Sequence, residues 1–191
     1  YTLCQRVSFK SSLGIDVSSK AIHQALKYGP NYQHVHPGDY SPVKGKSLIF
    51  LMDTLEHIQD DQNCLSGLMD SMAAGGQLLI SVPAMPSLSS EWDDALGHFR
   101  RYSKGSLRNL VNNSGGEILE VRYIFSYIVP AIFVRRKWMS QEFNATNCEF
   151  PTAPPLLNRF LLWCNRKEIF FANRLSPSLG SSLLCLAKKK D

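Results

Sequence analysis

Residues 47–58 read SLIFLMDTLEHI, and they decide the fold that we expect this chain to adopt. The first six form a nearly all-apolar run without alternation, which is typical of a central parallel strand with helices on both faces of its sheet. The chain turns polar at Asp53 and supplies Glu56 and His57 shortly afterwards. Because ligands of open α/β sheets bind beyond the carboxyl ends of strands, this segment predicts a site. The alternative is that Asp53 or Thr54 only caps a short helix and that His57 packs at its edge.

Strand and helix patterns alternate on both sides of this stretch. Residues 12–17 and 32–36 read as strands, and they flank a helix over residues 18–26 that Gly29 and Pro30 end. The later elements are expected as follows: a helix from Asp60 or Asp61 to Gly75 and Gly76, a strand over 77–82, a polar loop over 87–102, a helix from Ser103 to Gly115 and Gly116, a strand over 117–123, helices over 127–139 and 156–175, and a last strand over 181–187. This order predicts a parallel sheet with helices on both faces, in which the polar loop is the least core-like part.

Length and composition indicate one globular domain over residues 1–191. The five cysteines are widely spaced without a C-x-x-C pair, which favours a cytoplasmic location. His34 and His36 lack a third ligand, so we expect no metal site. The net charge is +5, but the basic residues form small clusters, so we expect no nucleic-acid partner. We expect no signal peptide, and the longest apolar runs are too short to span a membrane.

Four segments in this order carry a family resemblance: GIDVSSKAI over residues 14–22, LEHIQDD over 55–61, GGQLLISVPA over 75–84 and DDALGHFRRYS over 93–103. Together they resemble class I S-adenosylmethionine-dependent methyltransferases, particularly the small-molecule type with LEHI and H-x-R-R-Y elements. The resemblance covers roughly residues 10–125 and the last strand. It implies a Rossmann-like sheet that is mostly parallel with an antiparallel last strand, and a helical cap inserted over about residues 126–176.

The resemblance also implies that S-adenosylmethionine is the cofactor. Asp16, with Val17 beside it, matches the acidic residue that holds both ribose hydroxyls, a task suited to a carboxylate because it accepts two hydrogen bonds. Asp39 matches the residue that accepts from the adenine amino group, with Tyr40 as a ring neighbour. The alternatives are that Asp16 caps a helix and that Asp39 only forms a turn with Gly38.

Met52 and Asp53 match the strand end whose backbone lies beside the methionine portion of the cofactor. Family members begin with a strand and a glycine-rich turn of the type E-x-G-x-G-x-G, which this chain lacks. Residues 1–4 resemble the helix that follows that turn, so we expect the chain to be incomplete at its N-terminus. The complete protein is then expected to be a methyltransferase, whereas this stretch alone would bind the cofactor weakly.

Methyl transfer needs an aligned acceptor and the exclusion of water, and a hydroxyl acceptor also benefits from a base. His98 is the favoured base or substrate contact, and the alternative is that it bonds Asp94 or a backbone carbonyl to hold its loop. His57 is the second catalytic candidate, although a structural role is preferred for it. The remaining candidates for the substrate mouth are Trp92, Arg100, Arg101 and Tyr102.

Arg100 and Arg101 suit a carboxylate or phosphate, or one of them pairs with Asp93 or Glu91 and is architectural. The acceptor is expected to be a small molecule or a lipid- or glycan-linked group, methylated on oxygen. Residues 124–134 are apolar and residues 135–138 are mostly basic, a composition that suits a peripheral membrane contact. The alternative is a helix that packs in the core and has a basic, solvated end. The rival to the enzyme interpretation is a non-catalytic binding or scaffold domain with a degenerate methyltransferase fold.

Overall fold

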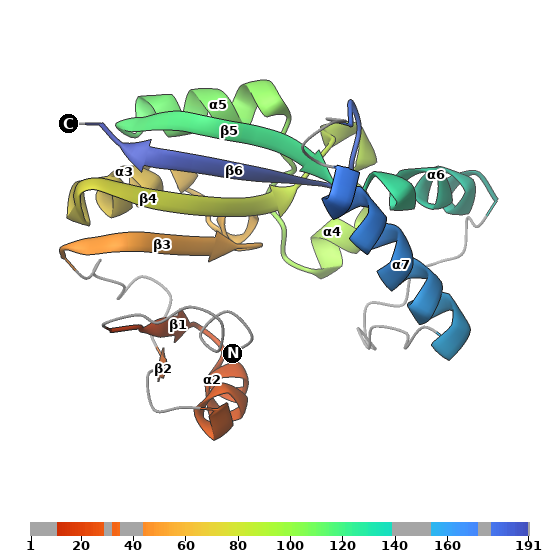
Figure 1. The fold of residues 1–191 in the computed structure, drawn as a ribbon, viewed down its shortest axis with the longest axis horizontal. Helices are drawn as coiled ribbons and strands as arrows, with labels where there is room; N and C mark the ends of the chain where they lie inside the picture. Colours follow the sequence, from red (N-terminus) through yellow and green to blue (C-terminus); the bar gives the residue numbers. More distant parts are fainter. Residues whose placement is uncertain (1–10, 29–31, 35–43, 139–153, 172–176, 191) are drawn as a thin grey trace. The chain divides into compact units, whose positions relative to one another are not determined.

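A computed structural model of the chain describes residues 11–28, 32–34, 44–138, 154–171 and 177–190 (Figure 1). These residues belong to two compact units, Tyr1–Pro42 and Val43–Asp191. Each unit is described by itself, and the single domain over residues 1–191 stays a prediction.

The first unit is a short βαβ segment. Strand β1 (Gly14–Asp16) pairs in parallel with β2 (Tyr32–His34), and between them lie helix α2 (Ser19–Ala25) and a 3-10 turn (Leu26–Tyr28). The expected cap is confirmed, because the Ser18 hydroxyl oxygen accepts from the backbone N–H of Ala21 at 3.2 Å. Gly29 and Pro30, expected to end this helix, lie outside the described residues.

The second unit contains a four-stranded sheet with the order β3-β4-β6-β5 (Figure 1). Its strands are β3 (Lys46–Met52), β4 (Met72–Pro83), β5 (Gly116–Ile124) and β6 (Ser182–Lys189). β3 and β4 are parallel, and β6 is antiparallel to both of its neighbours, so the parallel run and the antiparallel last strand are confirmed.

The expected central position of β3 is wrong for the described sheet, where β3 lies at one end of the order. Its side chains alternate: Ile49 and Leu51 pack against the buried core, whereas Leu48, Phe50 and Met52 are exposed. An all-apolar run shows that both faces of a strand are apolar. It does not show that helices cover both of them.

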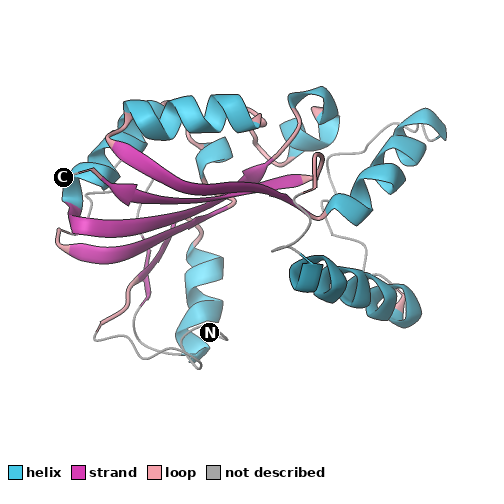
Figure 2. Ribbon diagram, turned by 45° about the horizontal axis from the view of Figure 1, so that its top comes forward, coloured by secondary structure: helices cyan, strands magenta, loops and turns pink. Residues whose placement is uncertain are grey.

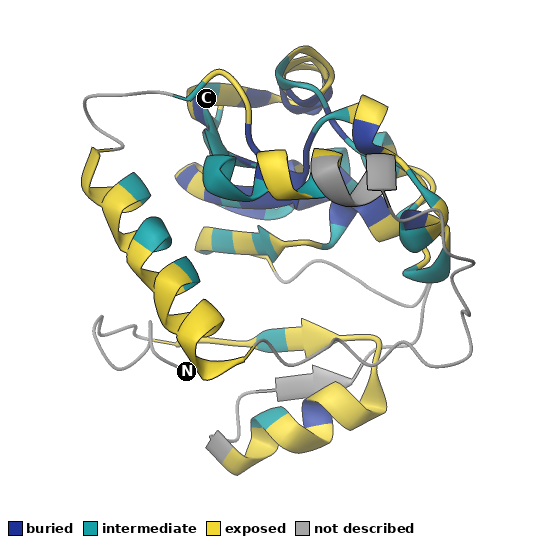
Figure 3. Ribbon diagram, turned by 90° about the vertical axis from the view of Figure 1, so that its right-hand side faces the viewer, coloured by how far each residue is buried: buried dark blue, intermediate teal, exposed yellow. Residues whose placement is uncertain are grey.

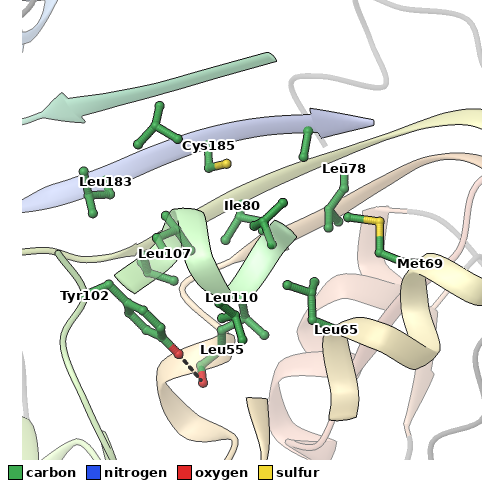
Figure 4. Close-up of a cluster of buried hydrophobic side chains, with 14 of the residues drawn as sticks. Leu55, Leu65, Met69, Leu78, Ile80, Tyr102, Leu107, Leu110, Leu183 and Cys185 are labelled. Atoms are coloured by element: carbon green, nitrogen blue, oxygen red, sulfur yellow. Dashed lines mark hydrogen bonds between the residues drawn. The ribbon is translucent and has the colours of Figure 1, made fainter. Parts of the chain in front are cut away.

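Helices α3 (Asp61–Ser71) and α5 (Lys104–Asn113) cover one face of this sheet (Figure 2). The expected starts are confirmed, because the Asp60 carboxylate accepts from Asn63 N at 3.0 Å and the Ser103 hydroxyl accepts from Ser106 N at 3.0 Å. The core under these helices is drawn in Figure 4. Its labelled members are Leu55, Leu65, Met69, Leu78, Ile80, Tyr102, Leu107, Leu110, Leu183 and Cys185.

Helix α3 ends earlier than expected. Gly75 and Gly76 were expected to stop it, but Met72 is already extended (φ −69°, ψ 152°) and begins β4. The Ser71 hydroxyl donates to Leu68 O at 2.7 Å, which satisfies one of the last helical carbonyls. Gly76 instead allows β3 to approach β4 closely, since a Cβ there would lie 3.2 Å from the carbonyl oxygen of Lys46.

Two helices come between β5 and β6 in the sequence: α6 (Val129–Trp138), after a 3-10 turn (Ser126–Ile128), and α7 (Pro155–Phe171). That they cap the sheet stays a prediction. Figure 3 shows α7 as mostly exposed. Within the described part of the chain, no helix combines the length and apolarity needed to cross a membrane.

Candidate functional site

Two chain segments meet where the parallel strands β3 and β4 end. Residues 53–61 follow β3 and residues 84–102 follow β4, and several hydrogen bonds join them directly. Phe99 N donates to Glu56 O at 2.7 Å, His57 Nδ1 lies 3.2 Å from Gly97 O, and Arg100 Nη2 donates to Gln59 O at 2.6 Å. The two segments therefore form one connected structure at the carboxyl ends of β3 and β4. This is the edge of the sheet at which the sequence predicted a site.

The first segment begins with a strained residue. Asp53 has a positive φ of 49°, and its N–H donates to both the backbone and side-chain oxygens of Ser81 at 3.0 Å. Left-handed backbone in a non-glycine residue costs energy and clusters at functional positions. The capping alternative is not seen, because the Thr54 hydroxyl donates back to Met52 O and makes no cap bond to the 3-10 turn Leu55–His57.

The second segment was expected to be a loop, and it contains a 3-10 turn (Pro86–Leu88) and the short helix α4 (Glu91–Ala95). Ser90 and Asp93 form a capping box at the start of α4. This S-x-x-D spacing is a sequence signal that could have predicted α4. The segment is also more core-like than expected, because Leu88, Asp93 and Tyr102 are buried.

Asp93 is the hub of the second segment. It is only 2% exposed, and one carboxylate oxygen accepts from Arg101 Nε at 2.8 Å and pairs with His98 Nδ1 at 3.0 Å. The other oxygen accepts from Ser90 N at 3.0 Å. Burial alone would raise its pKa, but the hydrogen bonds from Arg101 and His98 hold the pKa of Asp93 below its ordinary value.

The two candidate histidines lie together. Their ring centroids are 4.7 Å apart in an edge-to-face arrangement. His98 bonds Asp93, where the sequence offered Asp94 or a backbone carbonyl as the structural partner. His57 Nδ1 lies 3.2 Å from the backbone oxygen of Gly97, a contact that the sequence did not specify, and its structural role stays a prediction. Because a carbonyl or carboxylate only accepts, both rings donate through Nδ1–H in these contacts, which leaves Nε2 for another partner.

Glu56 is a residue of this site to which the sequence assigned no role. It is 1% exposed, and its Oε2 atom has no hydrogen-bond partner among the described residues. Burial raises its pKa from 4.5 to about 7, and the nearby negative charge of Asp53 also raises it. Its place in the LEHI element could be read from the sequence. Its burial, where residues 84–102 meet residues 53–61, could not.

Two candidates for the substrate mouth are engaged inside the protein. Arg100 Nη1 lies 2.8 Å from the Asp61 carboxylate, and the Tyr102 hydroxyl donates to the same carboxylate at 2.8 Å. The Tyr102 hydroxyl also reaches the Leu55 carbonyl, as Figure 4 shows. Burial raises the pKa of Tyr102 above its ordinary range, so the ring stays neutral. Trp92 lies half-buried in α4.

The proposed cofactor residues are divided between the two units. Asp16 is exposed at the end of β1, and its carboxylate accepts from Ser18 N at 2.7 Å, while Val17 is also exposed. Met52 and Asp53 are exposed at the end of β3. Asp39 and Tyr40 lie outside the described residues. The roles of all six residues stay predictions.

No protein-family model matches the chain, and no curated protein matches its sequence. A complex between the Trm112 methyltransferase activator of Haloferax volcanii and a candidate methyltransferase has a TM-score of 0.63 at 16% identity, covering 100% of this chain and 76% of that one. A SAM-dependent methyltransferase from Archaeoglobus fulgidus has a TM-score of 0.59 at 15% identity, covering 98% and 80%. The [4+2]-cyclase SpnF has a TM-score of 0.53 at 14% identity, covering 98% and 71%. The chain therefore has the Rossmann-like α/β fold of S-adenosylmethionine-dependent methyltransferases.

Proposed function

We propose that this chain is a methyltransferase domain that transfers a methyl group from S-adenosylmethionine to an oxygen atom of a small-molecule or lipid- or glycan-linked acceptor. The observation that carries the proposal is the Asp93–His98 pair beside the ends of two parallel strands. An imidazole supported by a carboxylate is suited to accept a proton from a hydroxyl near neutral pH. The fold shared with methyltransferases supports the same reaction.

The residues that would hold the cofactor are Asp16, Val17, Asp39, Tyr40, Met52 and Asp53. Within the first unit, the exposed Asp16 carboxylate has oxygens suited to the two ribose hydroxyls. Within the second unit, Met52 offers an exposed apolar side chain. Asp53, exposed and with a positive φ, ends the strand where the resemblance places the methionine portion of the cofactor. When bound, S-adenosylmethionine supplies an electrophilic methyl group on a sulfonium sulfur.

His98 is the residue that would act on the acceptor. With Nδ1–H bonded to Asp93, its Nε2 atom can take the proton that the acceptor hydroxyl loses, and the Asp93 carboxylate then stabilises the imidazolium. Arg101 keeps Asp93 ionised and also donates to Ala84 O at 3.1 Å, which fixes the start of the segment. Arg101 is therefore a positioning residue.

The substrate mouth would be lined by Trp92 and Arg100. Asp61 and Tyr102 would support it from the interior. Arg100 is partly exposed, so its guanidinium can pair with a carboxylate or phosphate of the acceptor while it contacts Asp61. Tyr102 acts from the core through Asp61. A lipid-linked acceptor is supported by exposed apolar side chains on both inserted helices, among them Phe133, Phe160 and Trp163. A cytoplasmic location and a peripheral membrane contact remain predictions.

The alternative function is a binding or scaffold domain without methyl transfer. One protein of similar fold is named a [4+2]-cyclase, which is not a methyl-transfer activity. The fold therefore does not by itself establish methyl transfer, and the alternative is kept. The two functions differ in one observable, which is turnover of the bound methyl donor.

The test uses the protein as its gene encodes it, with labelled S-adenosylmethionine and a panel of hydroxyl acceptors. We expect transfer to at least one acceptor, and we expect His98→Gln to lower kcat by about 100-fold or more. The matched control is His23→Gln, which changes an exposed histidine of α2 and should leave turnover unchanged. Binding of S-adenosylhomocysteine in a calorimeter without transfer to any acceptor would support the scaffold alternative. Unchanged turnover in His98→Gln would eliminate this residue as the base.

A further inference from the structure

Three potential metal ligands gather at the carboxyl ends of β3 and β4. Glu56, His57 and His98 each offer one ligand atom, and these atoms all lie within 4.8 Å of one another. The three come from two segments that are hydrogen-bonded together, so their spacing is set by the fold. One ion could contact all three residues.

The state of Glu56 is an independent sign that a cation belongs here. A buried carboxylate is normally paired, hydrogen-bonded or bound to a metal, since an isolated charge is expensive to bury. Glu56 is almost completely buried, and its Oε2 atom has no partner among the described residues. Arg101, the cation that lowers its pKa, is bonded through Nε to Asp93 and through Nη1 to Ala84. Within the described part of the chain, no salt bridge to the Glu56 carboxylate is seen.

Both histidines are prepared as ligands. A metal-bound histidine usually donates its other ring N–H to a carboxylate or a backbone carbonyl, which fixes the ring and its tautomer. His98 does this through Nδ1 to Asp93, and His57 does it through Nδ1 to Gly97 O. Asp93 is itself held by Arg101 and Ser90. Each ring is thus oriented by a bond at Nδ1 that leaves Nε2 free of protein partners in these contacts and available to an ion.

We propose that Glu56, His57 and His98 bind one divalent transition-metal ion of the zinc or ferrous class. Two imidazoles and one carboxylate are a ligand set for such ions, and they leave further positions open. Ligand atoms about 2.0–2.2 Å from one tetrahedral ion lie about 3.3–3.6 Å apart, so separations of up to 4.8 Å need to close by up to about 1.5 Å on binding. His57 is exposed, so its ring has room to shift toward the other two ligands.

The ion changes what His98 does. The ion and a proton compete for Nε2 of His98, so the base role proposed above belongs to the metal-free site. In the metal-bound site, the ion would instead lower the pKa of an acceptor hydroxyl at an open position, and that proton would pass to solvent. The metal site itself depends on neither S-adenosylmethionine nor an acceptor. Its test can therefore fail or succeed separately from that of the proposed function.

The experiment titrates chelator-treated protein with Zn²⁺ in a calorimeter and with Co²⁺ followed by optical absorption. We expect one ion per chain with micromolar or tighter affinity, and visible Co²⁺ bands of a site with nitrogen ligands. Glu56→Gln, His57→Gln and His98→Gln should each weaken binding by at least about 10-fold. Asp93→Asn removes the carboxylate behind His98 and should weaken it by about 10–100-fold.

Matched controls separate this site from adventitious binding. His23→Gln and Glu91→Gln change exposed residues outside the cluster and should leave affinity and stoichiometry unchanged. His57→Gln is the decisive variant, because His57 is exposed and its loss should not disturb folding, which circular dichroism checks. Failure of the protein to bind either ion, or equal affinity in His57→Gln and the unaltered protein, would overturn the proposal.

Discussion

Residues 84–102 and helix α7 (Pro155–Phe171) contrast in a way that composition would not suggest. Residues 84–102 are largely polar, yet they bury Asp93 and Tyr102 and bond to residues 53–61 at several points. Helix α7 is rich in apolar residues, yet Trp163 is 55% exposed and Phe170 is 72% exposed. Residues 84–102, although polar, are therefore the segment that packs into the interior of the second unit.

The difference shows that partners decide burial. Each polar group of residues 84–102 that enters the interior finds a specific partner, and such bonds compensate the cost of removing it from water. Several apolar residues of α7, among them Leu156, Phe160 and Trp163, follow a helical spacing and are nevertheless exposed, so apolar composition alone does not bury a side chain. A prediction that ranks segments by apolar content would therefore expect α7 to be buried and residues 84–102 to be exposed, which is the reverse of what the structure shows.

The largest expected effect comes from removing the hub of the polar segment. Asp93→Ala leaves Arg101 and His98 without their shared carboxylate, and breaking a buried charged pair costs about 3–5 kcal/mol. The free energy of unfolding from urea titration measures this loss. The control is Asp94→Ala, an exposed neighbour on the same helix, which should change stability by less than about 0.5 kcal/mol. Equal effects of the two substitutions would contradict the assignment of Asp93 as the hub.

An intermediate effect is expected at Glu56, which the polar segment covers. Its pKa is about 7 in the folded protein and ordinarily 4.5, so between these values the folded state binds more protons than the unfolded chain. Stability should therefore fall as pH rises through this window, by about 1–3 kcal/mol in total, and the loss should be complete above the folded pKa. Urea titrations at pH 5 and pH 8 in the presence of a chelator measure it.

The comparison variant for this pH dependence is Glu56→Gln, which cannot ionise. Its stability should change less between the two pH values than that of the unaltered protein, and the difference isolates Glu56 from the other titrating groups. A larger loss in Glu56→Gln than in the unaltered protein would contradict the raised pKa. Adding Zn²⁺ in place of the chelator should reduce the loss, because a bound cation stabilises the carboxylate.

Local signals in the sequence predicted most of the elements. Ser18, Asp60 and Ser103 cap helices as expected, because a cap depends only on residues within one turn. The position of β3 in the sheet was not predicted, because strand order depends on long-range pairing that an apolar run does not encode. The early end of α3 was missed because the glycine pair gave a stronger stop signal than Ser71.

The candidate site was predicted in its location and only partly in its contacts. His57, His98 and Arg101 were selected because they follow the two strands, and the structure brings them together. The choice of Asp93 over Asp94 depends on how α4 turns, which a segment taken as a loop could not supply. The burial of Glu56 was not predicted, because it depends on tertiary contacts such as the bond from Phe99 N to Glu56 O, which joins residues 84–102 to it.

The smallest effect on stability is expected in α7. Phe170→Ser removes a side chain that is mostly in water already, so the free energy of unfolding should change by less than about 0.5 kcal/mol. Trp163→Ser should cost slightly more, because its ring stacks on Phe160 with centroids 6.1 Å apart and lies 5.8 Å from Lys167 Nζ. Urea titration of both variants measures these changes against Leu107→Ala, a fully buried control expected to lose about 2–5 kcal/mol.

The same two variants show whether the exposed helix has a use. If α7 supports the predicted membrane contact, binding to vesicles containing phosphatidylserine should fall several-fold in Trp163→Ser and Phe170→Ser while folding stability stays nearly constant, because exposed aromatic residues would enter the interface with Lys167 near the anionic headgroups. Co-sedimentation with vesicles measures it. A stability loss comparable to that of Leu107→Ala would instead mean that α7 packs as core, and the contrast with residues 84–102 would disappear.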